Sequence, residues 1–199
     1  SGAGAYAGHG YVNSYQGYST AIGQNARASG WESTAIGSGA IADHSLATAM
    51  GVNARANARG ATALGNYARA TGYRSTSLGD WTQATGATSV ALGEYAAATG
   101  NSSAALGAYS SDAGFANSVA LGANSVVASD NSVSVGHSAA DINPLTGLAY
   151  GAELERQINH VAAGTVDTDA VNVAQLNAAA ADATTHYYSV NDGGTQGGN

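Results

Sequence analysis

Residues 62–79 read TALGNYARATGYRSTSLG, and this stretch contains the unit that is repeated along most of the chain. An aliphatic residue followed by glycine closes the unit at Leu64-Gly65 and again, 14 residues later, at Leu78-Gly79. The same kind of pair occurs at Ile22-Gly23, Ile36-Gly37, Met50-Gly51, Leu92-Gly93, Leu106-Gly107, Leu121-Gly122 and Val135-Gly136. Every step is 14 residues long except the step from Gly107 to Gly122, which is 15. A fixed period of this kind indicates a repeat architecture in which each unit packs on its neighbours.

The residues inside each unit alternate in size with a period of two. Ser or Ala stands four residues before the glycine of each pair, Ala or Ser stands two before it, and small residues return three and five after it in most units. Such alternation is typical of strands, and a second glycine in most units marks a second corner. A coil of 14 residues has a contour of about 46 Å, so its flattened lumen holds only small side chains. We therefore predict an all-β solenoid, a parallel β-roll with an interior of Ala, Ser and Gly.

The opposite face of the first strand carries a continuous aliphatic ladder with Thr or Val beside it in most coils. Soluble monomers avoid exposed apolar patches of this size, and burying one such side chain is worth about 1.5–3 kcal/mol. The alternative, that another segment of the chain covers the ladder, requires a long amphipathic segment that the sequence lacks. We therefore predict that the chain forms an oligomer through an interface made by Ile22, Ile36, Met50, Leu64, Leu78, Leu92, Leu106, Leu121 and Val135.

Composition narrows the possible functions. Only 10% of the 199 residues are charged, cysteine is absent, and the net charge of −7 argues against a general nucleic-acid partner. The five histidines are scattered without metal-ligand spacing, and the triplet Asp43-His44-Ser45 falls on a repeat corner, where neighbouring side chains diverge. We expect no catalytic site, no metal site and no cofactor.

Two rows of exposed side chains are candidates for ligand binding. Tyr67, Trp81, Tyr95 and Tyr109 each stand two residues after a repeat glycine, and Arg55 and Arg69 stand four residues after one. Equivalent positions on adjacent coils lie about 4.8 Å apart, so the rings are expected to stack. Aromatic side chains are frequent at binding hot spots because they offer large rigid surfaces. The alternative is that ladders of like residues only stabilise the surface of the solenoid.

The period stops after Gly136, and the character of the sequence changes. We predict a head at residues 1–146, a neck at 147–172, and the start of a coiled-coil stalk with the entry to a further module at 173–199. Asp169 is a candidate N-cap for the Ala-rich helix that follows. Val173, Leu176, Ala180, Ala183 and Tyr187 are spaced by three and four residues, as in a coiled-coil seam.

The repeats, for example Asn117-Ser118-Val119-Ala120-Leu121-Gly122, and the segment from Arg156 to Leu176 closely resemble the YadA-like head and neck of trimeric autotransporter adhesins. The resemblance implies a left-handed parallel β-roll, three chains side by side, and a neck that joins the head to a three-stranded stalk. It carries the neck motif onto Arg156, Ile158, His160, Asp169, Asn172, Gln175 and Leu176. His160 departs from the pattern, because the family usually has Asn there.

The resemblance also implies a function and a location. We expect a non-enzymatic bacterial surface adhesin that attaches to host cells or extracellular matrix, anchored to the outer membrane by a domain outside this sequence. Ice-binding β-solenoids, which also present Thr rows, and a purely structural spacer are the alternatives. Against ice binding, Thr gives way to Val or Ala from Val90 onward in the position beside the aliphatic ladder.

Overall fold

The structure is a computed structural model that describes residues 6–7 and 18–187 of the chain. The chain divides into two compact units, Ser1–Arg156 and Gln157–Asn199, and each is described by itself below. The division falls inside the segment that the sequence assigns to the neck. The partition into head, neck and stalk therefore stays a prediction.

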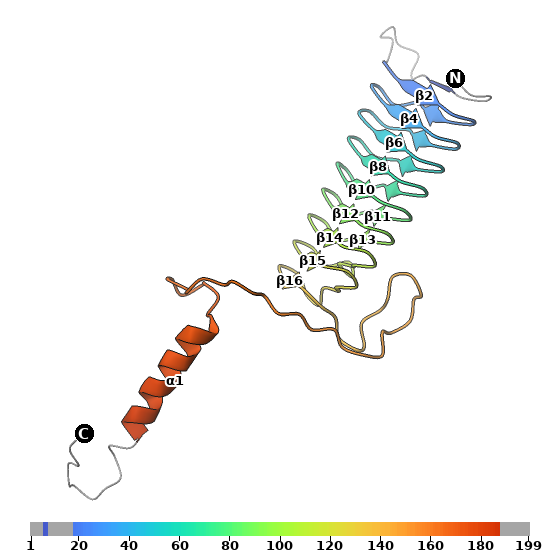
Figure 1. The fold of residues 1–199 in the computed structure, drawn as a ribbon. Helices are drawn as coiled ribbons and strands as arrows, with labels where there is room; N and C mark the ends of the chain where they lie inside the picture. Colours follow the sequence, from blue (N-terminus) through green and yellow to red (C-terminus); the bar gives the residue numbers. More distant parts are fainter. Residues whose placement is uncertain (1–5, 8–17, 188–199) are drawn as a thin grey trace, which may run out of the picture. The chain divides into compact units, whose positions relative to one another are not determined.

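The first unit is a solenoid built from two parallel sheets (Figure 1). The larger sheet has nine strands: β2 (Thr20–Ile22), β4 (Thr34–Ile36), β6 (Thr48–Met50), β8 (Thr62–Leu64), β10 (Thr76–Leu78), β12 (Val90–Leu92), β14 (Ala104–Leu106), β15 (Val119–Leu121) and β16 (Val133–Ser134). The smaller sheet has seven: β1 (Tyr6–Ala7), β3 (Arg27–Ala28), β5 (Ile41–Ala42), β7 (Arg55–Ala56), β9 (Arg69–Ala70), β11 (Gln83–Ala84) and β13 (Ala97–Ala98). The predicted two short strands per coil are confirmed.

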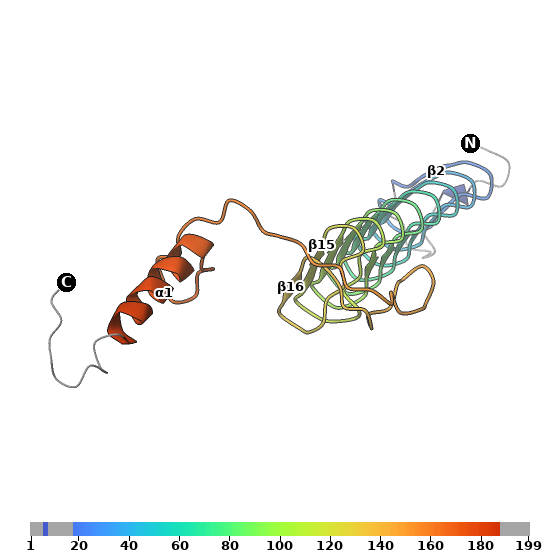
Figure 2. The same ribbon diagram turned by 60° about the horizontal axis from the view of Figure 1, so that its bottom comes forward.

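Neighbouring coils pair in register, so that each residue lies beside its equivalent in the next repeat. Leu78 pairs with Leu64 on one side and with Leu92 on the other. Backbone bonds continue the pairing beyond the strands, as where the amide of Thr62 donates to the carbonyl of Ser75 at 2.9 Å. Figure 2 shows the coils one behind another with the two sheets on opposite sides of a flattened tube. The 14-residue period of the sequence is thus the length of one turn of the solenoid.

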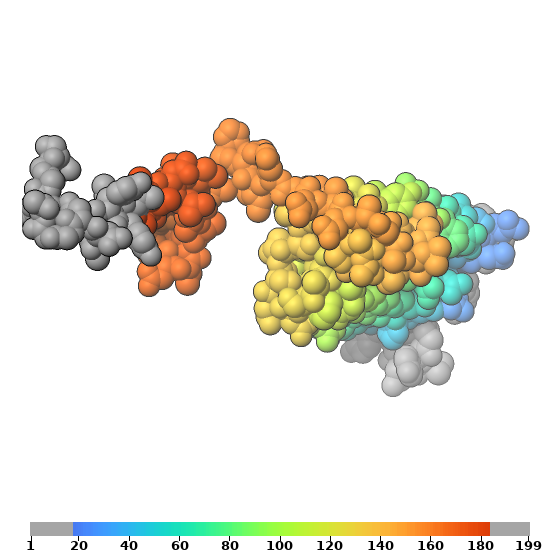
Figure 3. Space-filling model, turned by 90° about the horizontal axis from the view of Figure 1, so that it is seen from below, coloured from blue at the N-terminus to red at the C-terminus, as the bar shows by residue number. Residues whose placement is uncertain are grey.

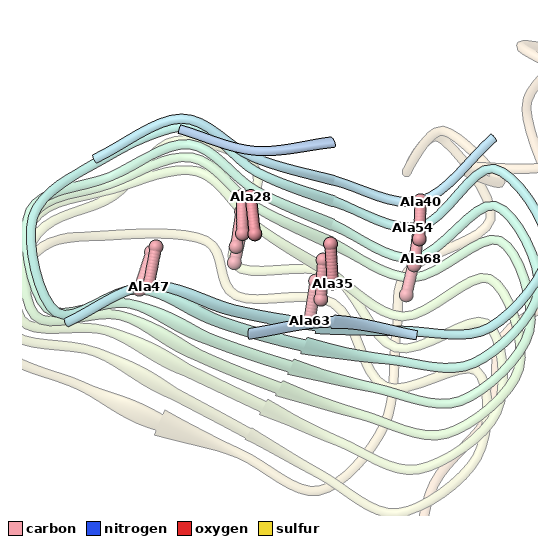
Figure 4. Close-up of a cluster of buried hydrophobic side chains, with 12 residues drawn as sticks. Ala28, Ala35, Ala40, Ala47, Ala54, Ala63 and Ala68 are labelled. Carbon is pink, nitrogen blue, oxygen red and sulfur yellow. The ribbon is translucent and has the colours of Figure 1, made fainter. Parts of the chain in front are cut away.

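The lumen is filled by methyl groups from both sheets. Ala35, Ala63 and Ala47 come from the larger-sheet side and Ala28 and Ala68 from the other, and all are fully buried (Figure 4). Serine stands at several of these lumen positions, and its hydroxyl often has a local acceptor: Ser33 Oγ donates to the carbonyl of Gly30 at 2.7 Å, and Ser89 Oγ does the same to Gly86 at 2.8 Å, whereas the buried Ser75 Oγ has no partner among the described residues. A buried hydroxyl with such a partner avoids most of the desolvation penalty. The prediction of a small-residue interior is confirmed.

One coil places two polar side chains in the lumen together. Ser77 and Thr82 occupy positions that are alanine in most other coils, and both are buried. Ser77 Oγ donates to Thr82 Oγ1 at 2.6 Å, and Thr82 Oγ1 donates to the carbonyl of Gly79 at 3.0 Å. The two substitutions satisfy each other, so the coil keeps a filled lumen without an unpaired hydroxyl at either position.

The 15-residue coil between Gly107 and Gly122 is accommodated by a buried aspartate. Asp112 is fully buried and accepts hydrogen bonds from the amides of Gly100 (2.7 Å) and Gly114 (3.0 Å) and from the hydroxyls of Thr99 (3.0 Å) and Ser103. A buried carboxylate needs several such donors to offset its lost hydration. Asp112 therefore fixes the backbone of the irregular coil to the coil before it.

Residues 137–156 cover one side of the last coils of the solenoid (Figure 3). Antiparallel bridges join His137 to Leu154 and Ile142 to Ala149, and in Figure 3 this gold to light-orange segment lies against the side of the last coils. Arg156 completes the cover: its guanidinium donates to the carbonyls of Ala123 (2.6 Å) and Val135 and to Ser125 Oγ (3.0 Å). These groups face the side where no further coil follows, and buried backbone polar groups require partners.

The second unit contains the helix α1 (Val173–Tyr187) and the segment before it. The expectation that Asp169 caps this helix is wrong. Asn172 is the N-cap: its side chain accepts from the amide of Gln175 (3.0 Å), and Gln175 Oε1 accepts from the amide of Asn172 (3.3 Å). This reciprocal pair is a capping box. Asp169 instead accepts from the amides of Thr165 (2.8 Å) and Val166 (3.2 Å), because its side chain closes the preceding turn.

The spacing of the coils predicts a sharp intolerance at the glycine corners. A Cβ added to Gly86 would lie 1.9 Å from the carbonyl oxygen of Gly100, so Gly86→Ala should lower the free energy of unfolding by about 3 kcal/mol or more. Gly60→Asn is the control, because Gly60 has φ +66° and its Cβ would meet only the flexible Arg74 side chain at 3.3 Å. Thermal unfolding monitored by circular dichroism should separate the two variants; equal melting temperatures would contradict the close approach.

The filled lumen predicts that the inside of the roll tolerates larger side chains less well than its outer face. Ala68→Leu adds three carbons to a fully buried position and should destabilise by about 1–3 kcal/mol, which lowers the Tm by roughly 3–10 °C. Ala97→Leu makes the same change on the half-buried outer face of β13 and should leave the Tm nearly unchanged. A Tm that is unaffected by Ala68→Leu would show that the lumen is not closely packed.

Candidate ligand-binding surface

The aliphatic ladder lies on the outer face of the larger sheet. Residues of this sheet alternate along each strand, so that Ala91 is buried while Val90 and Leu92 on either side are exposed. Ile22, Met50, Leu78, Leu92 and Leu121 are exposed by 39–49%, and Ile36, Leu64, Leu106 and Val135 are half-buried. The described residues thus leave an apolar face uncovered along the roll. That this face is the trimer interface stays a prediction.

The predicted aromatic row is present as a continuous stack, which is called the aromatic strip below. Ring centroids are 4.3 Å apart between Tyr67 and Trp81, 6.0 Å between Trp81 and Tyr95, and 5.6 Å between Tyr95 and Tyr109. The ring planes differ by no more than 11°. Parallel in-register coils enforce this arrangement, because each ring leaves the backbone at the same point of its turn.

The turns that carry the rings do not require them. Tyr67, Trp81, Tyr95 and Tyr109 all adopt left-handed backbone with φ of 54–59°. Asn and Gly adopt this conformation at lower cost than a bulky side chain, and they occupy the same corner at Asn25, Gly39, Asn53 and Asn124. The presence of an aromatic residue at this corner in four successive coils is therefore not explained by turn formation.

Opposite charges flank the two halves of the aromatic strip. Arg55 and Arg69 are direct partners on β7 and β9, and neither guanidinium group has an ion pair or hydrogen bond within the described residues. With Asn53, Tyr67 and Trp81 they line a hollow of about 350 Å³. Asp80 and Glu94 each immediately precede a ring of the later coils. Desolvation, and after it the charge of Glu94, raises the pKa of the Tyr109 hydroxyl above its usual value.

The residues beyond Tyr109 form a second ring pair that sequence reasoning missed. His137 and Tyr150 stack at 3.7 Å, His137 Nδ1 lies 2.7 Å from the carbonyl oxygen of Asn124, and the Tyr150 hydroxyl donates to the carbonyl of Tyr109 at 3.4 Å. The two residues are 13 positions apart and outside the repeat, so no periodicity connects them. Only the folding of residues 137–156 over the last coils brings them together.

The neck residues have separate structural roles. Gln175 joins the helix to the preceding loop, with Nε2 donating to the carbonyl of Gly164 at 3.0 Å and Oε1 accepting from its amide at 2.8 Å. His160 has φ 59°, a conformation that Asn adopts more readily. Ile158 and Leu176 are exposed by 71% and 62%. Hydrogen bonds from the amides of Thr165 and Val166 lower the pKa of Asp169.

These features define a class of protein: a parallel β-solenoid whose outer surface carries continuous ladders of like side chains. Among the described residues, no group of three or more His, Cys, Asp or Glu side chains is placed to hold a metal ion. No described helix has the length and apolar character needed to cross a membrane.

Comparison with known proteins identifies the family. The model for the YadA head domain repeat matches residues 17–40, 46–68, 70–96, 84–110 and 116–139, and the model for the coiled stalk of trimeric autotransporter adhesins matches residues 157–198. The crystal structure of the collagen-binding domain of the Yersinia adhesin YadA superposes with a TM-score of 0.57 at 31% sequence identity, covering 83% of this chain and 76% of that one. The chain belongs to the YadA-like trimeric autotransporter adhesins. A search of curated proteins by sequence found no match.

The interface prediction can be tested by placing charge on the apolar ladder. Leu92→Asp with Leu106→Asp should dissociate the trimer, because two unpaired carboxylates near its axis cost several kcal/mol each. The control variant, Gln83→Asp with Ala97→Asp, puts the same charges on the outer face of the smaller sheet. It should leave the mass of the assembly in solution unchanged. The measurement is light scattering coupled to size exclusion. An intact trimer of the first variant would place the interface elsewhere.

Proposed function

We propose that this chain is the head and upper stalk of a homotrimeric bacterial adhesin that binds extracellular matrix or host-cell surface molecules without catalysis. The observation that carries the proposal is the aromatic strip, a surface stack of rings that its turns do not need, exposed at Tyr67 and Trp81 and half-buried at Tyr95 and Tyr109. Family membership supports it, since the related Yersinia structure is described as a collagen-binding domain. Anchoring to the outer membrane through another part of the same protein follows from the family pattern.

The binding chemistry would divide between rings and guanidinium groups. Tyr67, Trp81, Tyr95 and Tyr109 offer apolar edges along the roll, and Arg55 and Arg69 offer paired donors for acidic groups. A trimer presents three copies of each row. A repetitive or fibrous partner that engages several copies gains avidity without any single strong contact.

The alternatives lead to different results in the same measurements. The Thr row runs through β2, β4, β6, β8 and β10 only and shares its face with exposed aliphatic residues, which disfavours an ice-binding plane. A spacer would form the trimer and bind no matrix protein. An adhesin would bind at least one member of a matrix panel that begins with collagen.

The test uses substitutions that the repeat itself tolerates. Asn is compatible with the left-handed corner, as Asn53 shows, so Tyr67→Asn with Trp81→Asn and Tyr95→Asn removes the rings while keeping the turns. Gln83 occupies the arginine row in β11, so Arg55→Gln with Arg69→Gln removes the charge in a compatible way. We expect each variant trimer to lose about tenfold or more in affinity for the bound matrix protein.

Salt separates the two contributions. Raising the salt concentration should weaken wild-type binding and have little further effect on the arginine variant, since exposed charges are screened within about 8–10 Å at physiological ionic strength. Arg27→Gln, which removes a cation already paired with Asp43, is the matched control and should bind like wild type. Full binding by both the ring variant and the arginine variant would place the adhesive surface elsewhere.

A further inference from the structure

The two ends of the aromatic strip are unequal. Beyond Tyr109, the stacked pair of His137 and Tyr150 is hydrogen-bonded to the backbone of the last coils. At the other end, the corner equivalent to Tyr67 in the preceding coil carries Asn53. The side-chain amide of Asn53 lies toward Gly39, since a Cβ added to Gly39 would be 2.4 Å from Asn53 Oδ1. The Asn53 side chain therefore points away from Tyr67. At this end of the strip, Tyr67 and Trp81 line the hollow of about 350 Å³ together with Asn53, Arg55 and Arg69.

The arginine row shows which group is missing from this hollow. Arg27 binds Asp43 through two hydrogen bonds, Nε to Oδ1 at 2.9 Å and Nη2 to Oδ2 at 2.6 Å, and Ser29 Oγ also donates to that carboxylate. Sixteen residues after Arg55 and Arg69, where Asp43 follows Arg27, the chain has Thr71 and Thr85. The two guanidinium groups thus lie on adjacent strands without the carboxylate that neutralises the first member of their row.

We propose that the open end of the aromatic strip binds an aromatic ring that carries an anionic group, in a polypeptide partner: a tyrosine bearing a sulfate or phosphate ester. The ring would continue the stack on Tyr67, and the ester oxygens would accept hydrogen bonds from Arg55 and Arg69. This inference deepens the proposed function, because it assigns a ligand class to one end of the proposed adhesive surface.

The charge pattern favours a single anion on a ring over a polyanionic chain such as a sulfated glycan. A polyanion requires a long run of cations, whereas the arginine row is interrupted by Ile41 before Arg55 and by Gln83 and Ala97 after Arg69. Further along the strip, Asp80 and Glu94 disfavour a second anion. Anion recognition is therefore confined to the hollow at Tyr67, and the same charges orient the rest of the partner along the strip.

Trp81 provides a direct signal for binding, since it packs 4.3 Å from Tyr67 and the chain has one other tryptophan, Trp31. The experiment uses the trimer with Trp31→Phe and measures Trp81 fluorescence during titration with four short peptides. They are identical except at one central residue, which is sulfotyrosine, phosphotyrosine, tyrosine or glutamate. We expect at least one ester peptide to bind about tenfold more tightly than the tyrosine and glutamate peptides. The ratio between the two esters identifies the anion.

Three variants test whether the preference for the ester peptides arises from the residues of the hollow. Arg55→Gln with Arg69→Gln should abolish the preference for the esters, Tyr67→Asn should weaken binding of both ester peptides about tenfold, and Arg27→Gln should change neither. Equal binding of all four peptides, binding of none, or tighter binding of a heparin fragment that does not depend on Tyr67 would overturn the proposal. If the peptides fail while matrix binding still depends on the aromatic strip, only this inference is wrong. If matrix binding is independent of the strip, the proposed function fails as well.

Discussion

Adjacent coils of this β-roll lie so close that a single added methyl group at the glycine corners would overlap the backbone of the next coil, as at Gly86 and Gly100. Across each coil, the two sheets lie near enough for alanine side chains to fill the lumen between them. Stability therefore comes from many small contacts and inter-coil hydrogen bonds, since no fully buried side chain of the described residues is larger than Val127. Everything on the surface depends on this constraint, because in-register stacking converts each repeat position into a continuous row.

The rows differ in how strongly the fold requires them. Inside the roll, the choice is limited to Ala, Ser and a few exceptions, such as Ser77 with Thr82, whose hydroxyls satisfy each other. Outside it, the corner that carries Tyr67 accepts Asn or Gly equally well. The residues of the aromatic strip and the arginine row can accordingly vary without changing the scaffold.

The last coils of the solenoid contain residues that depart from the regular repeat. The 15-residue coil is held by buried Asp112, and the last coils are closed by Arg156 and by the stack of His137 and Tyr150. Arg156 donates to the carbonyls of Ala123 and Val135, whose equivalents in earlier coils accept from backbone amides of the following coil. A solenoid without such an ending would expose unpaired backbone groups, which invite association with other chains. The end of the roll is thus as specifically built as its repeats.

The sequence by itself determined the repeat, the small-residue lumen and the stacking of the rings, because a strict period leaves one register in which equivalent residues become neighbours. It also placed Arg156, Asn172 and Gln175 in the neck motif, through resemblance to the family. Only the tertiary structure decided that Asn172 rather than Asp169 caps α1, because the two candidates differ in which amides they reach. The same holds for the ring pair beyond Tyr109 and for the hollow that Tyr67 and Trp81 share with Arg55 and Arg69. Contacts between non-equivalent positions follow from how side chains lean and how the last segment folds back, and a one-dimensional period carries no information about either.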